Sequence, residues 1–547
     1  MIEFKEQYNK NNQVTFLVDN ETVSISENKI KEYINNLRHR DSVHLVTANG
    51  QSKTLNRFID LDKSLYKIKP YSHQLEAINY GLNSKDSWLL LDDCGLGKTI
   101  SMIYLAEELK RTKNIEHCLI ICGVNSLKYN WADEIKKFSN LSYTILGQKI
   151  TKTGKKRIAT VKERCEILKN KIDEFFIITN IESMQSKDFI KAYNSSKNKF
   201  DMIVLDEAHH LKNPSSQSAK TLLKMKADYR IALTGTIIMN VPENSFVALK
   251  WTGNTNSTYT EFKRTFNVVG GFGGVQVIGH KNLDLLQQLI ASCSLRRRKE
   301  DVLDLPDKTY QTEYVELLPQ QQKLYDDVSE GILAELDKLD HIPTTMEEIT
   351  INMRRRQITA YPGSLSSDVT CSAKLDRLEE LVEEITNQGD KVLIFNSFKS
   401  AADEEYKRLE KYNPVLCTGA QPDDIIAINK NTFKEDDSCK VMIATWQKMG
   451  TGHTLTSANY CIFVDTPWTQ ADFDQASDRI YRIGQNKKVT IITLIAKDTY
   501  DERVQEILIN KECLSSYLVD NKVRNPSQVN YPRPTANALR GRSLQKL

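Results

Sequence analysis

Short apolar runs alternate with amphipathic segments along most of this 547-residue chain. In the first series, the runs at 88–91 and 118–122 are each followed by a segment with helical periodicity, at 99–110 and 127–138. The same rhythm returns later, in the runs Val392–Phe395, Val441–Ala444, Tyr460–Val464 and Val489–Ile495. Because buried strands joined by amphipathic crossover helices form parallel sheets, the pattern predicts an α/β fold with two parallel-sheet lobes.

Breaks in this rhythm predict the domain boundaries. Residues 1–65 alternate apolar and polar positions between turn signals, which is typical of a small strand-containing domain. The end of the chain combines prolines with polar and basic residues that bury little apolar surface. The predicted organisation is an accessory domain at 1–65, lobe 1 at 66–300 with a helical insertion after about residue 240, a helical linker at 301–370, lobe 2 at 371–512 and a basic mobile tail at 513–547.

The composition is that of a folded globular protein. Apolar residues make up 40% of the chain and charged residues 27%. No apolar run approaches the roughly 18 residues that a membrane-spanning helix needs, and the N-terminal segment resembles neither a secretory signal nor a transit peptide. We therefore expect a cytoplasmic protein without a membrane partner, and the missing targeting signals favour a bacterial or viral origin.

The charge is nearly balanced overall but not locally. Net charge is +4, from 75 basic and 71 acidic residues. Residues 149–171 carry nine Lys or Arg against two Glu, and residues 521–547 carry six basic residues and no acid. Either cluster suits contacts to phosphate groups, although a run of charge is more often a solvated face. The ten cysteines show no CxxC spacing, which predicts reduced thiols.

The strongest local signal is a glycine turn between a predicted strand and a predicted helix, in the sequence Leu-Leu-Leu-Asp-Asp-Cys-Gly-Leu-Gly-Lys-Thr that ends at Thr99. Backbone N–H groups around Gly95 and Gly97 suit phosphate oxygens. In such a loop Lys98 neutralises the β and γ phosphates and the Thr99 hydroxyl holds Mg²⁺. The sequence therefore predicts a nucleoside triphosphate site, although Asp92 stands where the generic pattern has its first glycine.

Two carboxylates follow the apolar run 202–205, at the strand end where open α/β sheets place their ligands. In this position Asp206 would bind Mg²⁺ and Glu207 would polarise the attacking water. Taken alone, the pair also fits a surface turn, but the phosphate loop before it favours a catalytic role. The neighbouring His209 and His210 do not predict zinc, because adjacent side chains do not easily meet one ion.

Two arginines in the second lobe are spaced for a catalytic cleft. Arg479 and Arg482 are three residues apart, which on a helix places them on one face. Paired guanidinium groups suit the charge that builds on a transferring γ-phosphoryl group. By themselves they fit an ordinary helix salt-bridge pair equally well.

These motifs occur in one order, which resembles the Swi/Snf-type branch of the superfamily two helicase-like ATPases. They are His73-Gln74, Asp93-Cys-Gly-Leu-Gly-Lys-Thr, Ser126-Leu-Lys-Tyr-Asn-Trp131, Asp206-Glu-Ala-His with Leu211-Lys-Asn-Pro, Leu233-Thr-Gly-Thr, Leu295-Arg-Arg-Arg-Lys-Glu-Asp-Val with Leu305-Pro, and the segment from Gln475 to Gln485. The resemblance covers about residues 66–510. It implies two RecA-like lobes that bind ATP and Mg²⁺ between them and track along double-stranded DNA, usually without separating the strands.

The resemblance also implies roles for residues that spacing alone does not identify. It adds Gln74, near the adenine, together with Asp93 and Gln475 to the nucleotide site. It assigns segments in both lobes to the DNA backbone, around Asn125, Ser126, Thr179, Asn180, Asn396, Ser397 and Thr445. Small polar groups at strand ends suit hydrogen bonds to phosphates.

Departures from the family pattern indicate a sub-branch. Ile237 replaces the usual proline after Thr-Gly-Thr, and Thr454 replaces a common asparagine in a motif that keeps only Gly450 and Gly452. This loosened motif is closer to fork-remodelling and strand-annealing relatives than to nucleosome remodellers. The missing chromatin-reading module also argues against nucleosome sliding.

The leading hypothesis is an ATP-dependent DNA translocase acting on duplex or branched DNA in replication, recombination or repair. One alternative is a strand-separating or RNA-dependent helicase of the same superfamily, which shares the phosphate loop and the Asp-Glu-Ala-His motif. Another is a DNA-binding scaffold switched by ATP, against which Glu207 and both arginines argue. We expect a monomer, with residues 1–65 or the tail available to a protein that recruits it.

Overall fold

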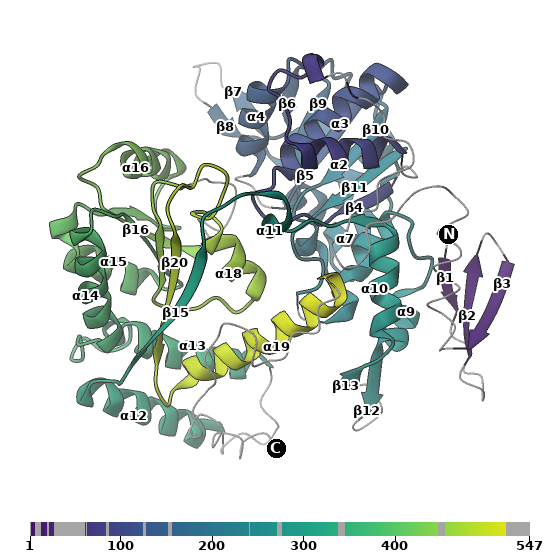
Figure 1. Cartoon of the computed structure of the whole chain (residues 1–547). Coiled ribbons are helices and arrows are strands. Elements are labelled where there is room, and N and C mark those ends of the chain that lie inside the picture. The colour runs from purple at the N-terminus through teal and green to yellow at the C-terminus, as the bar shows by residue number, and fades with distance from the viewer. Residues whose placement is uncertain are drawn as a thin grey trace. The chain divides into compact units, whose positions relative to one another are not determined.

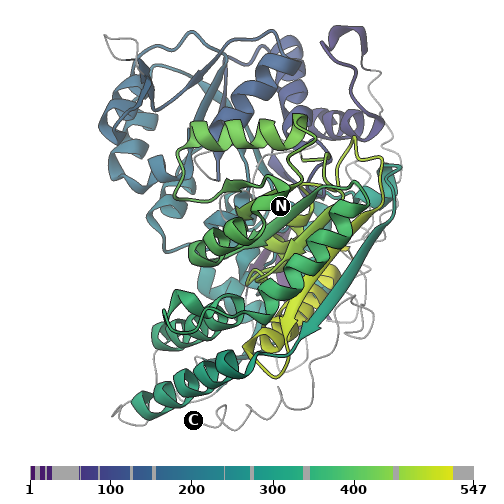
Figure 2. The same cartoon turned by 90° about the vertical axis from the view of Figure 1, so that its left-hand side faces the viewer.

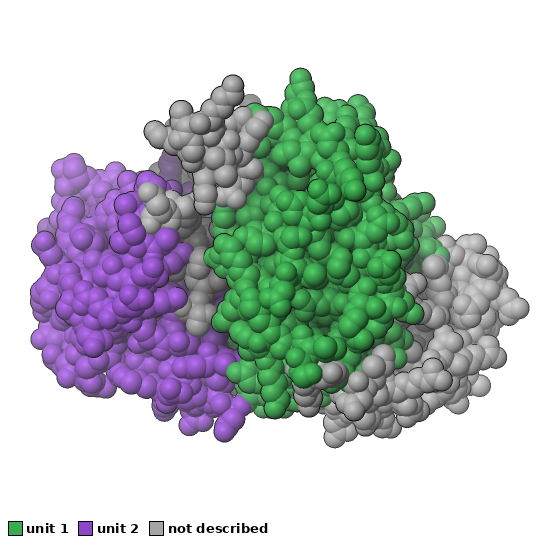
Figure 3. All heavy atoms as spheres, turned by 90° about the horizontal axis from the view of Figure 1, so that it is seen from above, with its two compact units in different colours: residues 1–303, 514–523 green, residues 304–513, 524–547 purple. Residues whose placement is uncertain are grey.

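The fold is taken from a computed structural model of the chain (Figure 1). The structure describes residues 2–5, 13–18, 21–26, 61, 63–83, 87–123, 127–150, 156–239, 241–270, 276–336, 345–446 and 455–520. These fall into two compact units (Figure 3). Unit 1 comprises Met1–Leu303 with Leu514–Val523, and unit 2 comprises Asp304–Cys513 with Arg524–Leu547.

Unit 1 is built on a seven-stranded sheet in which every neighbouring pair is parallel. The strand order is β14 (Ser294–Leu295), β4 (Ser87–Leu90), β11 (Tyr229–Leu233), β10 (Phe200–Leu205), β5 (His117–Cys122), β9 (Phe176–Asn180) and β6 (Tyr143–Ile145). The central strands are apolar because both of their faces are buried.

Helices cover both faces of this sheet (Figure 1). Side chains along β4 alternate between two apolar cores: Leu89 belongs to one and Trp88 and Leu90 to the other. Helices α2 (Ser72–Asn83), α3 (Lys98–Lys113) and α4 (Leu127–Phe138) pack into the second core. Helices α5 (Val161–Lys169), α6 (Lys187–Asn194), α7 (Gln217–Leu222), α8 (Phe246–Trp251), α9 (Tyr259–Phe266) and α10 (Leu283–Ser292) pack into the first.

Three smaller strand groups complete unit 1. At its N-terminus β1 (Ile2–Lys5), β2 (Gln13–Val18) and β3 (Glu21–Ser26) form an antiparallel sheet, in line with the alternating pattern there. The other two groups are hairpins, β7 (Gln148–Ile150) with β8 (Lys156–Ile158) and β12 (Asn267–Gly270) with β13 (Gln276–His280). A short helix, α11 (Lys299–Val302), ends the first segment of the unit.

Unit 2 contains a six-stranded sheet that is also parallel throughout. Its order is β15 (Lys308–Val315), β20 (Val489–Ala496), β19 (Tyr460–Phe463), β16 (Val392–Asn396), β18 (Val441–Thr445) and β17 (Val415–Cys417). Helices α14 (Ala373–Asn387) and α15 (Lys399–Arg408) pack on one face (Figure 2), and α16 (Asp423–Glu435) and α18 (Gln470–Ser477) pack on the other. The predicted fold of two parallel-sheet lobes is confirmed.

Two elements differ from the segments expected from the sequence. Residues 308–315, which fall in the expected helical linker, form strand β15 and pair with β20 over eight residues. The linker expected at 301–370 also contains helices α12 (Pro319–Leu336) and α13 (Thr345–Ala360). Helix α19 (Tyr500–Asp520) continues through the boundary expected at 512/513, and the rest of the expected tail lies outside the described residues. No described helix is both long and apolar enough to cross a membrane.

Candidate nucleotide site and nucleic-acid segments

The phosphate loop joins the end of β4 to the start of α3 in unit 1. Gly95 and Gly97 have φ angles of 91° and 80°, a left-handed conformation that favours glycine. A Cβ atom at Gly97 would also collide with the side-chain amide of Gln74. The turn therefore needs both glycines, and it leaves the N-terminus of a 16-residue helix, which begins at Lys98, facing the loop.

Lys98 is held inside the loop. Its Nζ donates to the main-chain oxygens of Asp92, at 2.8 Å, and Asp93, at 3.3 Å. Burial opposes its charged form, but Cys94, Glu207 and the nearby aspartates outweigh that effect and raise the pKa of Lys98. The ammonium therefore stays charged, as a partner for phosphate requires.

Asp92 explains the departure from the generic loop sequence. Its carboxylate is fully buried and forms an ion pair with the guanidinium of Arg297, whose Nε lies 3.0 Å from Oδ1. The main-chain N–H of Arg297 donates to the same oxygen at 3.1 Å. On the next residue, Asp93 pairs with Arg296 at 2.6 Å and accepts from the Lys299 main chain at 3.0 Å. The loop is thus fastened to the segment between β14 and α11.

Helix α2 also contacts the loop. The Nε2 atom of His73 lies 2.8 Å from the main-chain oxygen of Leu96, and the Gln74 amide reaches the same oxygen at 3.5 Å. The other end of the Gln74 side chain accepts from the Tyr71 main chain at 3.0 Å. Gln74 is therefore placed beside the loop and fixed in orientation.

Asp206 and Glu207 follow β10 directly. Both oxygens of Asp206 accept hydrogen bonds, Oδ1 from the Glu207 main chain at 2.9 Å and Oδ2 from the Trp131 indole at 2.8 Å. Glu207 has φ of 51°, a strained conformation for a residue with a side chain and one that clusters at functional sites. His209 Nδ1 lies 3.3 Å from the Glu207 carboxylate and 3.1 Å from the Thr234 hydroxyl.

The two carboxylates titrate differently. Burial and the neighbouring Glu207 charge raise the pKa of Asp206. Burial also acts to raise the pKa of Glu207, but the hydrogen bond and charge of His209, together with Lys98, lower it overall. Glu207 is therefore kept ionised, the form that accepts a proton from water.

The oxygen donors at this site fit a magnesium ion. Carboxylate and hydroxyl oxygens, here those of Asp206 and Thr99, are the hard ligands that Mg²⁺ prefers. No group of three or more His, Cys, Asp or Glu side chains able to hold a metal occurs among the described residues. A few protein oxygens completed by substrate phosphates is the usual arrangement for Mg²⁺.

The arginines of unit 2 lie in a turn rather than on a helix. Helix α18 ends at Ser477, after which the main-chain N–H groups of Arg479 and Gln485 bond three residues back. The Nε atoms of Arg479 and Arg482 donate to the main-chain oxygens four residues earlier, of Gln475 and Asp478, both at 2.9 Å. The expected shared helix face is thus replaced by a turn whose main chain fixes both guanidinium stems.

The segments expected at the DNA backbone lie at strand ends, but several of their side chains are already used. Thr179 and Asn180 are buried at the end of β9, where both contact Ser183 and Asn180 also accepts from Arg164 at 3.2 Å. Asn396 is buried at the end of β16 and donates to Glu405 at 2.6 Å.

The remaining expected contacts divide in two. Ser397 accepts from the Trp446 indole at 2.8 Å and donates to Asp465. Thr445, which pairs with Asn396 across β16 and β18, is buried. Asn125 and Ser126 lie outside the described residues, as does Thr454. The described side chains among these expected contacts are therefore held by contacts within the protein.

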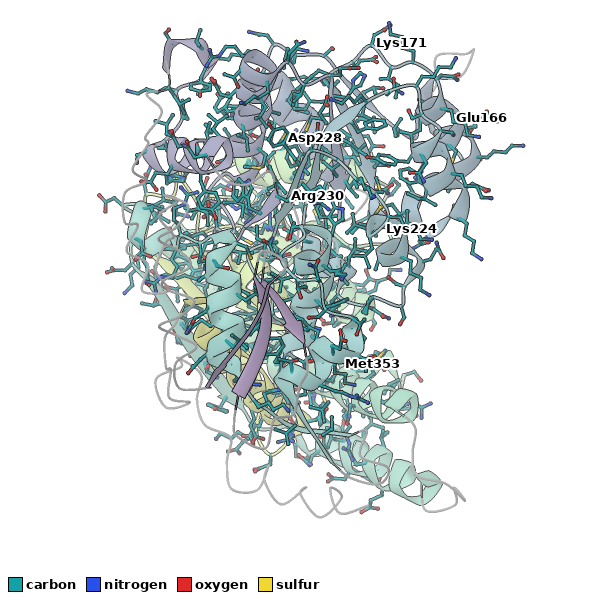
Figure 4. All side chains as sticks on the ribbon, turned by 90° about the vertical axis from the view of Figure 1, so that its right-hand side faces the viewer. Glu166, Lys171, Lys224, Asp228, Arg230 and Met353 are labelled. Atoms are coloured by element: carbon teal, nitrogen blue, oxygen red, sulfur yellow. The ribbon has the colours of Figure 1, made fainter. Side chains whose placement is uncertain are left out.

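Part of the basic cluster at 149–171 is described. Lys171 and Glu166 project from the surface of unit 1 (Figure 4). Lys171 is 81% exposed and only loosely paired with Asp173, at 3.9 Å. Such an exposed cation is open to a polyanion but equally suited to solvent.

Family comparisons decide the class of this site. A model described as the SNF2-related domain matches residues 13–364, and a helicase conserved C-terminal domain matches residues 373–484. The chain belongs to the SNF2-related family. The resemblance drawn from the motifs is confirmed, and the chain carries both the SNF2-related domain and the helicase C-terminal domain of an ATPase.

Relatives of this SNF2-related ATPase include an uncharacterized ATP-dependent helicase of Mycoplasma pneumoniae, 28% identical over 85% of this chain and 44% of the relative. The putative ATP-dependent helicase/translocase YwqA of Bacillus subtilis is 26% identical over 83% and 49%. The DNA annealing helicase and endonuclease ZRANB3 of Bos taurus is 28% identical over 82% and 40%. The chain thus spans less than half the length of these relatives.

Among solved structures, the SWI2/SNF2 ATPase core of Sulfolobus solfataricus in complex with dsDNA is 26% identical, covering 87% of this chain and 99% of that one, with a TM-score of 0.39.

Sequence reasoning missed three side chains that support the site of this SNF2-related ATPase. Arg297 holds Asp92, Trp131 holds Asp206, and Lys308 lies 3.4 Å from Asp478, the residue before Arg479. Arg297 and Trp131 stand inside motifs that the sequence displays, but their partners are distant along the chain. Lys308 has no local signal at all.

Proposed function

We propose that this SNF2-related ATPase hydrolyses Mg²⁺-bound ATP to translocate on duplex or branched DNA in replication, recombination or repair. The observation that carries the proposal is that Lys98, after β4, and Asp206 with Glu207, after β10, follow the carboxyl ends of strands in the same parallel sheet of unit 1. This set supplies a phosphate cation, a metal ligand and a base for water.

Each group has a distinct task in the proposed reaction. Lys98 and the loop N–H groups would bind the β and γ phosphates, and Thr99 with Asp206 would hold Mg²⁺, whose charge would offset that of the phosphates. Glu207, kept ionised beside His209, orients the attacking water and takes its proton. Arg479 and Arg482 of unit 2 carry the positive charge suited to the transferring γ-phosphoryl group, and we expect them to act when DNA is bound.

DNA as the partner is supported by the family and by relatives whose names specify DNA annealing or translocation. Strand ends carrying the segments around Thr179, Asn396 and Thr445 would supply main-chain groups suited to phosphates. Contacts of this kind follow the backbone and read no sequence, as translocation along arbitrary DNA requires.

The test is steady-state ATP hydrolysis without nucleic acid and then with duplex DNA, single-stranded DNA, a model fork and RNA. We expect strong stimulation by duplex or forked DNA, followed by triplex displacement or fork regression. Stimulation by RNA or single strands alone would replace the proposal with a conventional helicase, and turnover that stays negligible with every nucleic acid would favour an ATP-switched scaffold.

Two variants test the assignment of the site. Glu207→Gln and Lys98→Ala should each lower stimulated turnover by about 10²-fold or more, because each removes a group acting on the reacting phosphate. Glu300→Gln and Lys113→Ala are matched controls on exposed positions of α11 and α3 and should leave turnover unchanged. Normal turnover in either site variant would refute the assignment.

A further inference from the structure

One hydrogen bond connects helix α4 to the magnesium carboxylate within unit 1. The Nε1–H group of Trp131 donates to Oδ2 of Asp206 at 2.8 Å, and the two residues are only 1% and 7% exposed. They are 75 residues apart in the chain. Trp131 is on the buried face of α4 together with Leu127 and Ile135.

The bond determines how the carboxylate is presented. Oδ1 of Asp206 is fixed by the Glu207 main chain, so the indole is the side-chain contact that fixes Oδ2. An ionised carboxylate has about four acceptor sites, and the two hydrogen bonds therefore leave capacity for a metal ion. Because the indole ring is packed in an apolar core, it cannot follow the carboxylate if the latter rotates.

Helix α4 begins at Leu127, immediately after the segment that carries Asn125 and Ser126. A shift of this helix by about 1 Å would stretch a 2.8 Å hydrogen bond beyond its useful range. Helix α4 and the Asp206 carboxylate are therefore joined by one hydrogen bond.

We propose that Trp131 is a positioning residue that orients Asp206 toward Mg²⁺ and couples α4 to the nucleotide site. The proposal deepens the proposed function and rests on it for the identity of the metal ligand. It assigns Trp131 no contact with ATP or with the reacting atoms.

Trp251 provides a matched control in the same unit. It is also 1% exposed, and its indole N–H donates at 3.3 Å to a main-chain oxygen, that of Met225. Trp131→Phe and Trp251→Phe remove the same group from equally buried sites, but only the first frees a carboxylate. A purely structural role predicts the same outcome for both variants.

The first measurement is the affinity of the full chain for a fluorescent ADP, with Mg²⁺ and with a chelator. Without Mg²⁺, Trp131→Phe should bind the fluorescent ADP as tightly as wild type does. The increase in affinity on adding Mg²⁺ should be about tenfold smaller in the variant, which is the usual effect of removing a hydrogen-bond partner of a metal ligand. Trp251→Phe should retain that gain. A full gain in Trp131→Phe, or equal losses in both variants, would overturn the proposal.

The second measurement needs no substitution at Trp131. In protein labelled with [¹⁵N]tryptophan, the five indole N–H signals can be assigned by elimination from Phe variants of the other four tryptophans. Adding Mg²⁺ with ADP should shift the Trp131 signal and leave the Trp251 signal in place. A Trp131 signal that does not move on Mg²⁺ addition would overturn the proposal.

Failure of the proposed function is distinguishable from failure of this inference. If DNA does not stimulate ATP hydrolysis by the wild-type protein, the translocase proposal is refuted. The ADP affinities and the indole N–H signals still test the role of Trp131 in that case. If DNA stimulation is normal in Trp131→Phe and its Mg²⁺ gain is intact, the function stands and the role of Trp131 is refuted.

Discussion

A buried ion pair at the phosphate loop makes stability and nucleotide binding depend on single side chains. Asp92 has no exposure, and the 5% exposed Arg297 is its ion-pair partner. Arg297→Met would leave a buried carboxylate without its counter-charge, which typically costs about 3–5 kcal/mol. We expect a lower unfolding temperature and loss of nucleotide binding, measured by calorimetry and fluorescent ADP.

Arg298 offers the control for this variant. It is adjacent in sequence, but its partners Glu300 and Asp301 are 62% and 33% exposed. Surface pairs contribute about 0–1 kcal/mol, so Arg298→Met should behave nearly as wild type. Similar small effects for both variants would show that the Asp92 pair does not hold the loop.

Glu405 in unit 2 gives a pH-dependent prediction. Burial, and secondarily the charge of Asp465, raise its pKa to about 7, while Asn396 bonds one of its oxygens. Between about pH 4.5 and 7 the folded state keeps a proton that the unfolded state has lost, so this group lowers stability as pH rises through that range. Glu405→Gln should therefore be more stable than wild type at pH 8, by about 3 kcal/mol, and equal to it near pH 4.

The measurement is thermal unfolding of both proteins across this pH range. Glu383→Gln, at a 58% exposed position of α14, serves as the control and should show no such difference. If Glu405→Gln were no more stable than wild type at pH 8, ionisation of the buried Glu405 carboxyl would cost no stability, and the prediction would be wrong.

Among individual residues, the sequence predicted those that stand in a short motif with other residues of the same site. Lys98 and Glu207 stand in short motifs whose local geometry follows from a strand, a turn and a helix. Arg297 could not be paired with Asp92, because the two are 205 residues apart and meet only once β14 joins the sheet beside β4. The same holds for Trp131, whose apolar helix position gives no sign that its N–H reaches a carboxylate.

Among the elements, the edge strand β15 carries a side chain that supports the arginine turn. Lys308 lies 3.4 Å from both Asp478 and Ser477 and 5.2 Å from the centre of the Tyr481 ring. Lys308→Met should loosen the turn that holds Arg479. We expect DNA-stimulated kcat to fall about tenfold, with nucleotide affinity unchanged because the phosphate loop is in unit 1.

Lys497 is the matched control, since it follows β20, the neighbouring strand, and pairs with an 82% exposed Glu316. Lys497→Met should leave both kcat and KM as in wild type. A Lys308→Met variant with normal stimulated turnover would show that the arginine turn is held without the lysine.

Strand β15 also shows why the hydrophobic pattern does not predict every element. Its sequence, Lys-Thr-Tyr-Gln-Thr-Glu-Tyr-Val, is mostly polar, and seven of its eight residues are partly buried or exposed, as an edge strand allows. The central strands β5, β10 and β16 each contain an unbroken apolar run of at least four residues, which the sequence pattern identifies directly. Helix α18 ends early for a tertiary reason, because the following turn is tied down by Gln485, which donates to Ala458 and Ile480.

At the scale of the whole molecule, the repeated rhythm of strands and helices correctly predicted two parallel-sheet lobes. The order of the strands did not follow from it. In unit 1 the last strand, β14, returns to the edge beside the first, β4, and in unit 2 the first and last strands, β15 and β20, are neighbours. The position of such a strand depends on which sheet edge is free after the central strands have paired. The local sequence pattern does not contain that information.

If the chain translocates on DNA as proposed, it should bind DNA through the phosphate backbone, and this yields a prediction for the intact chain. Affinity should fall with rising salt, with a logarithmic slope of about −0.9 for each phosphate neutralised. Duplexes of equal length but different base sequence should bind within about twofold of one another, because phosphate contacts carry no sequence information. Fluorescence anisotropy between 50 and 200 mM salt measures both quantities. Affinities that differ tenfold with sequence at constant length, or that ignore salt, would indicate recognition of bases and would contradict translocation along arbitrary DNA.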